Sequence, residues 1–435
     1  MSKTPPICGI CREVLGAPPA AGMPPYHPSC LREHPEFLEP PENVGVKLDA
    51  VANAGAVGST EWVEEFNRQF GAMLKPSDEV PPITYRSSGS IALDVALGGG
   101  WPRGRVIDVI GREGSGKTLL FELAAVAAQK MEGKRSVLFD FEGTFDPKRF
   151  VSLGGDPKML DVVRAENVMD QKAPLLFGET AYDMARIIFM HSNTHACLCF
   201  DSTGAMVSKS DYEKREESIE KTGYGVETAR LISDGLKLLI GTGMLARSGM
   251  THFYISQSRD NLTQRAIRGI PPPDKPTGGR ALRFYASMRV EVSKGDTLKA
   301  TLEDDTTGVV DTNVEVGHVT KIRVRKNKCN SYQGRVAEFN LFTGGELQGL
   351  DRVSELATLA IYSGVAKRGG SWYEVPNIFR VKGKEVFPKA IEDNFAEVEK
   401  LVRTRLAEIM DGSSQPETEE EQDVLEDGSG EPQAE

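Results

Sequence analysis

The sequence has no apolar stretch long enough to cross a membrane and no N-terminal secretion signal. A bilayer span needs roughly 18 to 20 uninterrupted apolar residues, and no run approaches that length. The first residues, MSKTPPICGIC, lack the basic and then apolar pattern of a signal peptide. We therefore expect a cytoplasmic protein with no membrane partner.

Cysteine is scarce, and its placement argues against a disulfide framework. Three of the six cysteines lie within the first thirty residues, and Cys197, Cys199 and Cys329 are scattered. We therefore expect the cysteines to be reduced. Cys197 and Cys199 alternate along an apolar run, where they are expected to be packing residues.

Positive charge is also in short supply, which normally counts against a nucleic-acid partner. The net charge is −11, with a pI near 5.3. Residues 411–435, however, hold ten acidic residues and no Lys or Arg, so the other 410 residues carry 52 basic residues against 53 acidic ones. The body is near neutral, and any basic surface must be local.

Changes in composition divide the chain into five parts. Residues 1–42 are proline-rich and carry a Cys/His cluster, and residues 43–79 read as a linker and a short helix. Residues 80–345 form a long α/β pattern and 346–410 a small α/β domain. The tail, 411–435, is rich in like charge and is predicted to be disordered.

The short helix has an apolar face that it cannot bury alone. Trp62, Phe66 and Phe70 recur at spacings of four before Gly71 ends the helix. This face must dock on the protein's own core or on a neighbouring subunit.

The central part alternates apolar runs with helical segments, which predicts a mainly parallel sheet covered on both faces. Helices are expected to begin near Gly116, Ala173 and Val226. The predicted strands are Arg105 to Ile110, Ser136 to Phe141, Ala196 to Phe200, Thr251 to Ser256, Met288 to Val292, Thr320 to Arg325 and Val336 to Phe342.

A glycine-rich octet follows the first of these strands and opens a helix, the context that a phosphate-binding loop requires. Its members are Gly111, Arg112, Glu113, Gly114, Ser115, Gly116, Lys117 and Thr118. Backbone N–H groups of such a loop wrap phosphates at a helix N-terminus, Lys117 reaches the β and γ phosphates, and Thr118 holds Mg²⁺. The octet predicts ATP binding.

Three polar residues follow other predicted strands, at the sheet edge where ligands bind. Asp201 is expected to help hold Mg²⁺ beside Thr118. Glu142 is a candidate to orient or deprotonate an attacking water, and Gln257 a candidate sensor of the γ phosphate. For each residue, the alternative is an ordinary capping or solvated residue at a strand end.

A long connection after Gln257 is the candidate DNA-binding loop. Arginines and glycine N–H groups suit contact with phosphates, and one face of the helix from Val226 can support the same strand. The alternative is a solvated loop and an ordinary polar helix face. The candidate DNA-binding residues are Arg230, Ser233, Lys237, Arg259, Arg265, Arg268, Gly278, Gly279 and Arg280.

The N-terminal cluster has the spacing of a small zinc module. Cys8 and Cys11 form one pair, and His27 and Cys30 form a second pair fifteen residues later. A segment with so little apolar content needs a metal or another staple to fold, and we predict bound Zn²⁺, with a cysteine-bearing disordered tail as the alternative.

Three longer motifs resemble the bacterial and phage RecA recombinase family over roughly residues 61–409. They are Ser88-Gly-Ser-Ile-Ala-Leu-Asp-Val-Ala-Leu-Gly, Phe139-Asp-Phe-Glu-Gly-Thr-Phe-Asp-Pro147 and Thr277-Gly-Gly-Arg-Ala-Leu-Arg-Phe-Tyr-Ala-Ser287. The resemblance implies an ATPase that forms helical filaments on single-stranded DNA and pairs it with duplex DNA in recombination and repair.

The resemblance also assigns roles to single residues. Glu142 is implied to be the catalytic carboxylate, and Gln257 to couple nucleotide state to the DNA loop. Lys326 and Lys328 are implied to reach the ATP of an adjacent subunit, and the Trp62 helix to dock on the next protomer. Trp372 and Tyr373 are implied to belong to a C-terminal domain that helps admit duplex DNA. The acidic tail is implied to restrain this DNA binding.

The chain departs from the family pattern in four places. Both expected DNA loops are about four residues longer than usual, and the second lacks its aromatic residue. Arg149 stands where the family commonly has an adenine-stacking tyrosine, and guanidinium stacking can substitute. The Cys/His module resembles the zinc-finger start of RadA-type proteins, but Lys326-Asn-Lys-Cys-Asn330 is not their motif.

The sequence therefore predicts an ATP-driven DNA recombinase, with two alternatives left open. One is a filament scaffold in which ATP only gates assembly for DNA-damage signalling. The other is a RadA-like branch-migration motor or hexameric helicase. Single-strand-binding or mediator proteins are candidate partners.

Overall fold

The computed structural model describes residues 61–71, 74–165, 176–191, 193–217, 226–259, 275–276, 279–303, 310–342 and 349–410. These belong to two units, Met1–Pro82 and Ile83–Glu435. Within the described segments, no helix combines the length and apolar character that a membrane span requires.

The first unit contains the predicted amphipathic helix. Helix α3 (Glu61–Phe70) ends at Gly71, whose φ of 76° suits glycine, and a 3-10 turn follows at Ser77–Glu79. Trp62, Phe66 and Phe70 are all exposed, and the two phenylalanine rings lie 4.8 Å apart. Among the described residues of this unit, the apolar stripe therefore has no apolar partner outside its own helix.

The second unit is built around a mixed ten-stranded sheet. Its order is β12-β11-β10-β9-β3-β7-β6-β4-β5, and β8 pairs with β7. The strands from β9 through β3 to β5 run parallel, whereas β10, β11 and β12 are added antiparallel. The strands are β3 (Val106–Gly111), β4 (Arg135–Asp140), β5 (Leu160–Val163), β6 (His195–Asp201), β7 (Thr251–Arg259), β8 (Lys275–Pro276), β9 (Met288–Glu303), β10 (Val310–Asn327), β11 (Val336–Phe342) and β12 (Gly349–Leu350). A two-residue pair, β1 (Tyr85–Arg86) and β2 (Trp101–Pro102), lies beside it.

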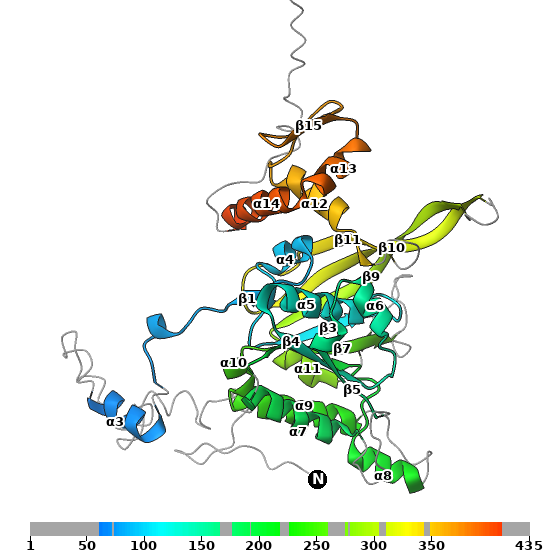
Figure 1. Ribbon diagram of the computed structural model, residues 1–435. Coiled ribbons are helices and arrows are strands. Elements are labelled where there is room, and N and C mark those ends of the chain that lie inside the picture. The colour runs from blue at the N-terminus through cyan, green and yellow to red at the C-terminus, as the bar shows by residue number, and fades with distance from the viewer. Residues whose placement is uncertain are drawn as a thin grey trace, which may run out of the picture. The chain divides into compact units, whose positions relative to one another are not determined.

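Helices cover both faces of the sheet (Figure 1) because each parallel strand is apolar on both sides. On β6, Cys197 and Cys199 pack in the cluster that contains α5, whereas Leu198 and Phe200 pack in the cluster that contains α7 and α9. The two cysteines are packing residues, as predicted. The helices are α4 (Ile91–Leu97), α5 (Lys117–Glu132), α6 (Pro147–Ser152), η3 (Pro157–Met159), α7 (Gly178–His191), α8 (Lys209–Glu217), α9 (Val226–Gly241), α10 (Met244–Ser248) and α11 (Gly279–Tyr285).

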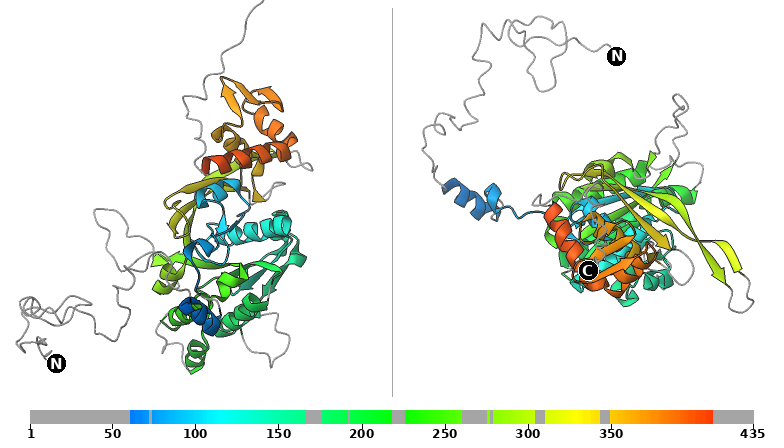
Figure 2. Two further views of the ribbon diagram at one scale, coloured as in Figure 1. Left: turned by 90° about the vertical axis from the view of Figure 1, so that its left-hand side faces the viewer. Right: turned by 90° about the horizontal axis from the view of Figure 1, so that it is seen from above.

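The α/β fold predicted from sequence is confirmed, and the structure adds several strands and lengthens others. Strand β5 forms the far edge of the sheet and is absent from the prediction. Strands β9 and β10 are also much longer than the predicted segments, and their hairpin extends beyond the sheet in both figures (Figures 1 and 2). Strand β10 pairs with β11 only over Gly317 to Arg323, so the outer part of the hairpin pairs only with itself.

The C-terminal elements have their own apolar core. The sequence predicts a small α/β domain here, and the described residues form three helices and a three-stranded antiparallel sheet. Trp372 and Tyr373 lie in the central strand, and the ring of Tyr373 stacks on Phe387 at 4.6 Å. The elements are α12 (Arg352–Tyr362), β13 (Lys367–Gly369), β14 (Trp372–Val375), β15 (Phe379–Lys382), α13 (Val386–Asp393) and α14 (Phe395–Met410).

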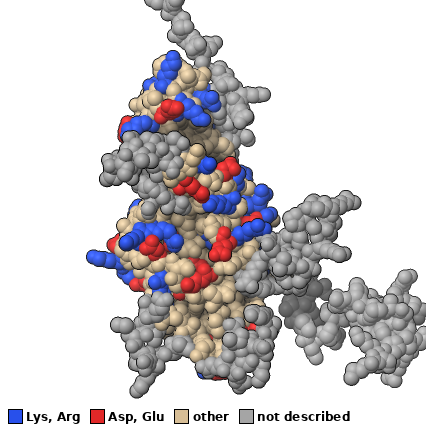
Figure 3. Space-filling model, turned by 90° about the vertical axis from the view of Figure 1, so that its right-hand side faces the viewer, with Lys and Arg blue, Asp and Glu red and all other residues tan. Residues whose placement is uncertain are grey.

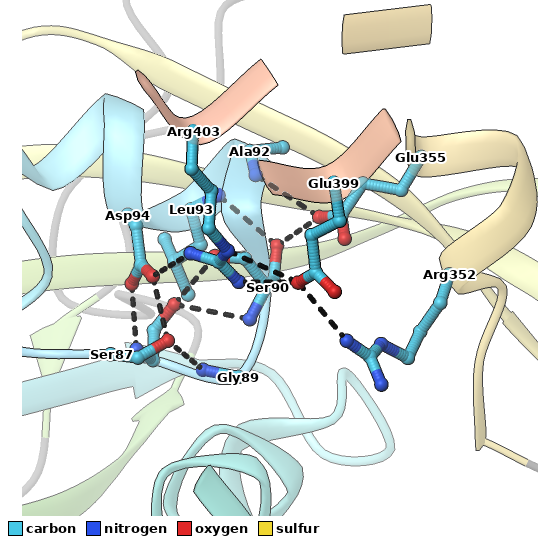
Figure 4. A network of polar contacts seen from close by, with 11 residues as sticks. Ser87, Gly89, Ser90, Ala92, Leu93, Asp94, Arg352, Glu355, Glu399 and Arg403 are labelled. Carbon is cyan, nitrogen blue, oxygen red and sulfur yellow. Dashed lines mark hydrogen bonds and ion pairs between the residues drawn. The ribbon is translucent and has the colours of Figure 1, made fainter. Parts of the chain in front are cut away.

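A buried polar network joins these elements to α4 (Figure 4). Glu355 of α12 accepts hydrogen bonds from the Ser90 hydroxyl and, at 3.1 Å, from the Ala92 backbone N–H, so it caps the N-terminus of α4. Burial raises the pKa of the Glu355 carboxyl. Arg403 of α14 lies 2.8 Å from Glu399 and 3.9 Å from Asp94 of α4.

Candidate nucleotide site

The glycine-rich octet forms the predicted loop between β3 and α5. Gly114 and Gly116 have φ of 69° and 90°, which side-chain-bearing residues rarely adopt. A Cβ at Gly111 would lie 2.4 Å from the Val292 carbonyl oxygen and 2.7 Å from Ser115 Oγ. Lys117 opens α5, and its Nζ donates to the Arg112 carbonyl at 2.7 Å. Burial lowers the pKa of Lys117.

The loop borders a cavity of about 340 Å³ that collects most of the predicted site residues. A pocket of this size suits a bound small molecule. The predicted residues that line it are Glu113, Gly114, Gly116, Lys117, Thr118, Glu142, Arg149, Asp201 and Gln257.

The residues around Thr118 fit a magnesium-bound triphosphate. Thr118 Oγ1 donates to Asp201 Oδ2 at 2.6 Å, which places two hard oxygen ligands side by side. Burial raises the pKa of Asp201 to about 6. Ser115 Oγ is buried with no hydrogen-bond partner among the described residues, as expected for a group that faces a ligand.

Glu142 lies in the turn after β4, and the structure explains why this turn is ordered. Asp140 accepts hydrogen bonds from the backbone N–H groups of Thr144 and Phe145 and from Arg164. Glu142 Oε1 then accepts from Gln257 Nε2 at 2.9 Å and from the Ser202 hydroxyl. Glu142 and Gln257, predicted separately, are thus in direct contact.

Arg149 lines the cavity with its guanidinium held in place. It makes two hydrogen bonds to Glu122, at 2.6 and 3.2 Å, and the Glu122 side chain is fully buried. Burial raises the pKa of Glu122, and Arg149 opposes that rise. The arrangement presents a fixed planar cation, which can stack on a base.

Sequence reasoning misses several polar residues at or beside the cavity, among them Ser202, Glu122 and His318. Ser202 directly follows Asp201, so its position was a usable signal. Glu122 lies on the buried face of α5, and only the fold brings it to Arg149. His318 lines the cavity from β10, and its buried Nε2 has no partner in the described part of the chain. Burial lowers the pKa of His318.

Lys326 and Lys328 do not line this cavity. They lie at the end of β10 and beside it, against the C-terminus of α11. Lys326 Nζ donates to the backbone carbonyls of Arg283 and Ala286, both at 2.7 Å, and Lys328 Nζ to that of Phe284 at 3.1 Å. Both side chains therefore lie outside the nucleotide cavity of their own subunit.

The predicted DNA-binding face of α9 carries an acidic residue that the sequence analysis overlooks. Arg230 and Lys237 are exposed, but Asp234 lies between them, 3.8 and 2.9 Å away. Ser233 is half-buried. On the face shown in Figure 3, Lys and Arg side chains are interspersed with Asp and Glu.

Most of the remaining predicted DNA-binding and zinc-binding residues, or their side chains, lie outside the described part of the chain. Gly279 begins α11, and the side chains of Arg259 and Arg280 are outside the described set. Arg265, Arg268 and Gly278 lie outside the described residues, as do Cys8, Cys11, His27 and Cys30. No group of three or more potential metal ligands occurs within the described ranges.

Comparison with known proteins connects this site to a family. Residues 60–347 match the model of the RecA N-terminal domain. Protein RecA of Kineococcus radiotolerans is 34% identical over 341 residues, covering 77% of this chain and 87% of that protein. Protein RecA of Frankia casuarinae is 33% identical, covering 79% and 90% of the two chains. Because the family model covers more than half of the chain and relatives at 33% to 34% identity cover most of it, the chain belongs to the RecA family of ATP-dependent DNA recombinases.

Proposed function

We propose that ATP binds in the 340 Å³ cavity and that its presence controls how firmly a helical filament of this protein grips single-stranded DNA. Lys117 and the backbone of residues 111–116 hold the phosphates, and Arg149 stacks on the base. Thr118 and Asp201 hold Mg²⁺, which neutralises phosphate charge when it is bound.

The contact between Gln257 and Glu142 is the observation that carries the proposal. Glu142 Oε1 can orient and deprotonate an attacking water, and the same oxygen holds the Gln257 amide at 2.9 Å. Gln257 belongs to β7, the strand that leads into the predicted DNA loop. A change in the contacts of Glu142 therefore acts on Gln257 and, through it, on the backbone that enters this loop.

The site is completed by a second subunit in this proposal. Lys326 and Lys328 contact the ATP of the adjacent protomer, and the exposed stripe of α3 docks on that protomer. The family resemblance supports both contacts, and the position of both lysines outside their own cavity supports the first. DNA phosphates pair with Arg230, Lys237 and the arginines between residues 259 and 280, and duplex DNA is admitted by the C-terminal elements.

Two substitutions test the ATPase mechanism. Lys117→Ala should abolish ATP-dependent filament formation and strand exchange, because it removes the phosphate contact. Glu142→Gln should still assemble with ATP but hydrolyse it on the order of 10²- to 10⁴-fold more slowly, the usual range for loss of a general base. Intact strand exchange in Lys117→Ala would overturn the mechanism.

The scaffold alternative makes a different prediction for the same variant. If ATP only gates assembly for DNA-damage signalling, Glu142→Gln keeps full biological activity. If recombination needs turnover, the variant stalls after filament formation. Ring-shaped particles in place of filaments would instead favour a RadA-like motor.

For the N-terminal residues we propose a zinc module with ligands Cys8, Cys11, His27 and Cys30, supported by their spacing. Metal analysis should find one zinc per chain, and a Cys8→Ser variant should lose it. Freely alkylated Cys8 in metal-free wild-type protein would contradict this.

We further propose the division of the chain into the five parts given by its composition, with 80–345 as the ATPase core and 346–410 as the C-terminal domain. The family relationship supports a cytoplasmic protein. Single-strand-binding or mediator proteins remain proposed partners.

A further inference from the structure

A buried ion pair lies at the centre of the sheet, next to the nucleotide cavity but not part of it. Asp108 of β3 is 2% exposed, and its Oδ2 accepts a hydrogen bond from Arg289 Nε of β9 at 2.6 Å. Replacing such a pair with apolar residues is often neutral or stabilising, because burying charges is costly. Stability alone is therefore a weak reason for its presence.

On one side, Asp108 is connected to the nucleotide cavity. Its Oδ1 accepts from Ser256 Oγ at 3.0 Å, and Ser256 directly precedes Gln257, which contacts Glu142. Ser256 Oγ also lies 3.3 Å from Thr203 Oγ1, two residues beyond Asp201. The pair is thus joined to both strands that supply catalytic groups, β6 and β7.

On the other side, the pair reaches the lysine proposed to act on the next subunit. In the sheet register, Arg289 lies beside Asp108 on β3 and opposite Lys326 on β10. Burial and the charges of Lys328 and Arg289 lower the pKa of Lys326 to about 8, and Asp108 opposes this. Arg289 and Asp108 therefore influence the Lys326 ammonium in opposite directions, and burial and Lys328 have the larger effects.

We propose that Asp108 and Arg289 are positioning residues that connect the nucleotide cavity of one protomer to Lys326, and so to the nucleotide of its neighbour. The proposal rests on the function assigned above to Lys326. Hydrogen bonds run from Thr203 through Ser256 and Asp108 to Arg289, and the sheet register places Lys326 opposite Arg289. This route would link the nucleotide in a protomer's own cavity to the nucleotide of the neighbouring protomer that its Lys326 contacts.

The test needs a variant that removes the pair without leaving one charge buried alone. Asp108→Leu combined with Arg289→Met replaces both charges with apolar groups of similar size, and it should fold. DNA-stimulated ATP hydrolysis of this double variant should fall about tenfold or more, because misplacing a catalytic contact slightly has effects of this order. KM for ATP should stay near the wild-type value, since the protomer's own phosphate loop is untouched.

Mixed filaments separate this role from a structural one. An excess of Glu142→Gln protein supplies ATP-bound protomers with an intact Lys326 but little turnover of their own. In such mixed filaments, the double variant should hydrolyse ATP at no less than half of the wild-type rate. The rate is counted per protomer that carries an intact Glu142. A Lys326→Ala protein, treated identically, should also recover.

The outcomes distinguish this inference from the proposed function. If Lys326→Ala recovers in mixed filaments and the double variant does not, the lesion lies within the variant's own subunit and the inference is wrong. If the double variant alone hydrolyses ATP at the wild-type rate, the inference is also wrong. If neither recovers, Lys326 does not act across subunits, and the proposed function fails together with the inference.

Discussion

His252 gives the structure a stability that depends on pH in a calculable way. The side chain is fully buried on β7, its ring lies 4.7 Å from that of Phe200 and 4.4 Å from that of Tyr254, and neither ring nitrogen has a partner among the described residues. Burial lowers the pKa of His252 from 6.5 to about 3. The folded protein therefore holds this imidazole neutral at pH values where the unfolded chain protonates it.

The direction and size of the effect follow from this difference. Above pH 6.5 neither state binds the proton, so the full stability is present, and it is lost as the pH falls from 6.5 towards 3. Each pKa unit corresponds to about 1.4 kcal/mol, so His252 should lower the free energy of unfolding by about 2 kcal/mol between pH 7 and pH 5. His252→Phe keeps an aromatic ring in the cluster and removes the proton uptake.

The assay is urea unfolding of wild type and His252→Phe at both pH values. Trp101, fully buried with its ring 5.2 Å from Phe253, reports the core if Trp62 and Trp372 are replaced by Phe in both proteins. Other groups contribute equally to the two proteins, so the difference between their losses isolates His252. Equal losses in wild type and variant would refute the reasoning.

Three further predictions concern single residues of the nucleotide site and of the polar network around Glu355. Gly111→Ala should abolish nucleotide binding in equilibrium titrations, because the new Cβ would lie 2.4 Å from a backbone oxygen; retained affinity would contradict the loop geometry. Arg149→Ala should weaken ATP roughly tenfold while leaving inorganic triphosphate unaffected, as expected for lost stacking on the base; equal weakening of both would remove that role. Glu355→Ala should lower the free energy of unfolding of the C-terminal elements by about 1 to 3 kcal/mol, since it leaves buried donors on Ser90 and Ala92 unsatisfied. Glu355→Gln keeps an acceptor and should cost clearly less in the same urea titration, and identical losses would argue against the capping contact.

Much of the fold follows from local pattern. The octet at residues 111–118 was identifiable because a buried strand precedes it and a helix follows, and β11 has the limits that its alternation predicts. Strand β5 was not identifiable, because it has only four residues, Leu160–Val163. The length of the β9–β10 hairpin was overlooked, although Leu298, Ala300 and Leu302 alternate with polar residues in the outer part of β9 and were a usable signal.

The site was predictable only where a residue's position along its strand indicated a role. Asp201 and Gln257 lie in strands that the sequence predicts, and Glu142 follows one, so parallel pairing alone brings them to one edge. The Glu122–Arg149 and Asp108–Arg289 pairs join residues 27 and 181 positions apart, and no local pattern records such contacts. Asp234 differs, because it lies four residues after Arg230 and three before Lys237, so helical spacing alone was a usable signal for both contacts.

The central claim is that a nucleotide held between identical subunits controls their hold on DNA. Electron microscopy of the protein with single-stranded DNA and a non-hydrolysable ATP analogue tests it most directly. The account predicts continuous helical filaments with the analogue, and none without nucleotide or with the Lys117→Ala variant. Single particles that bind DNA equally well with and without the analogue would contradict it.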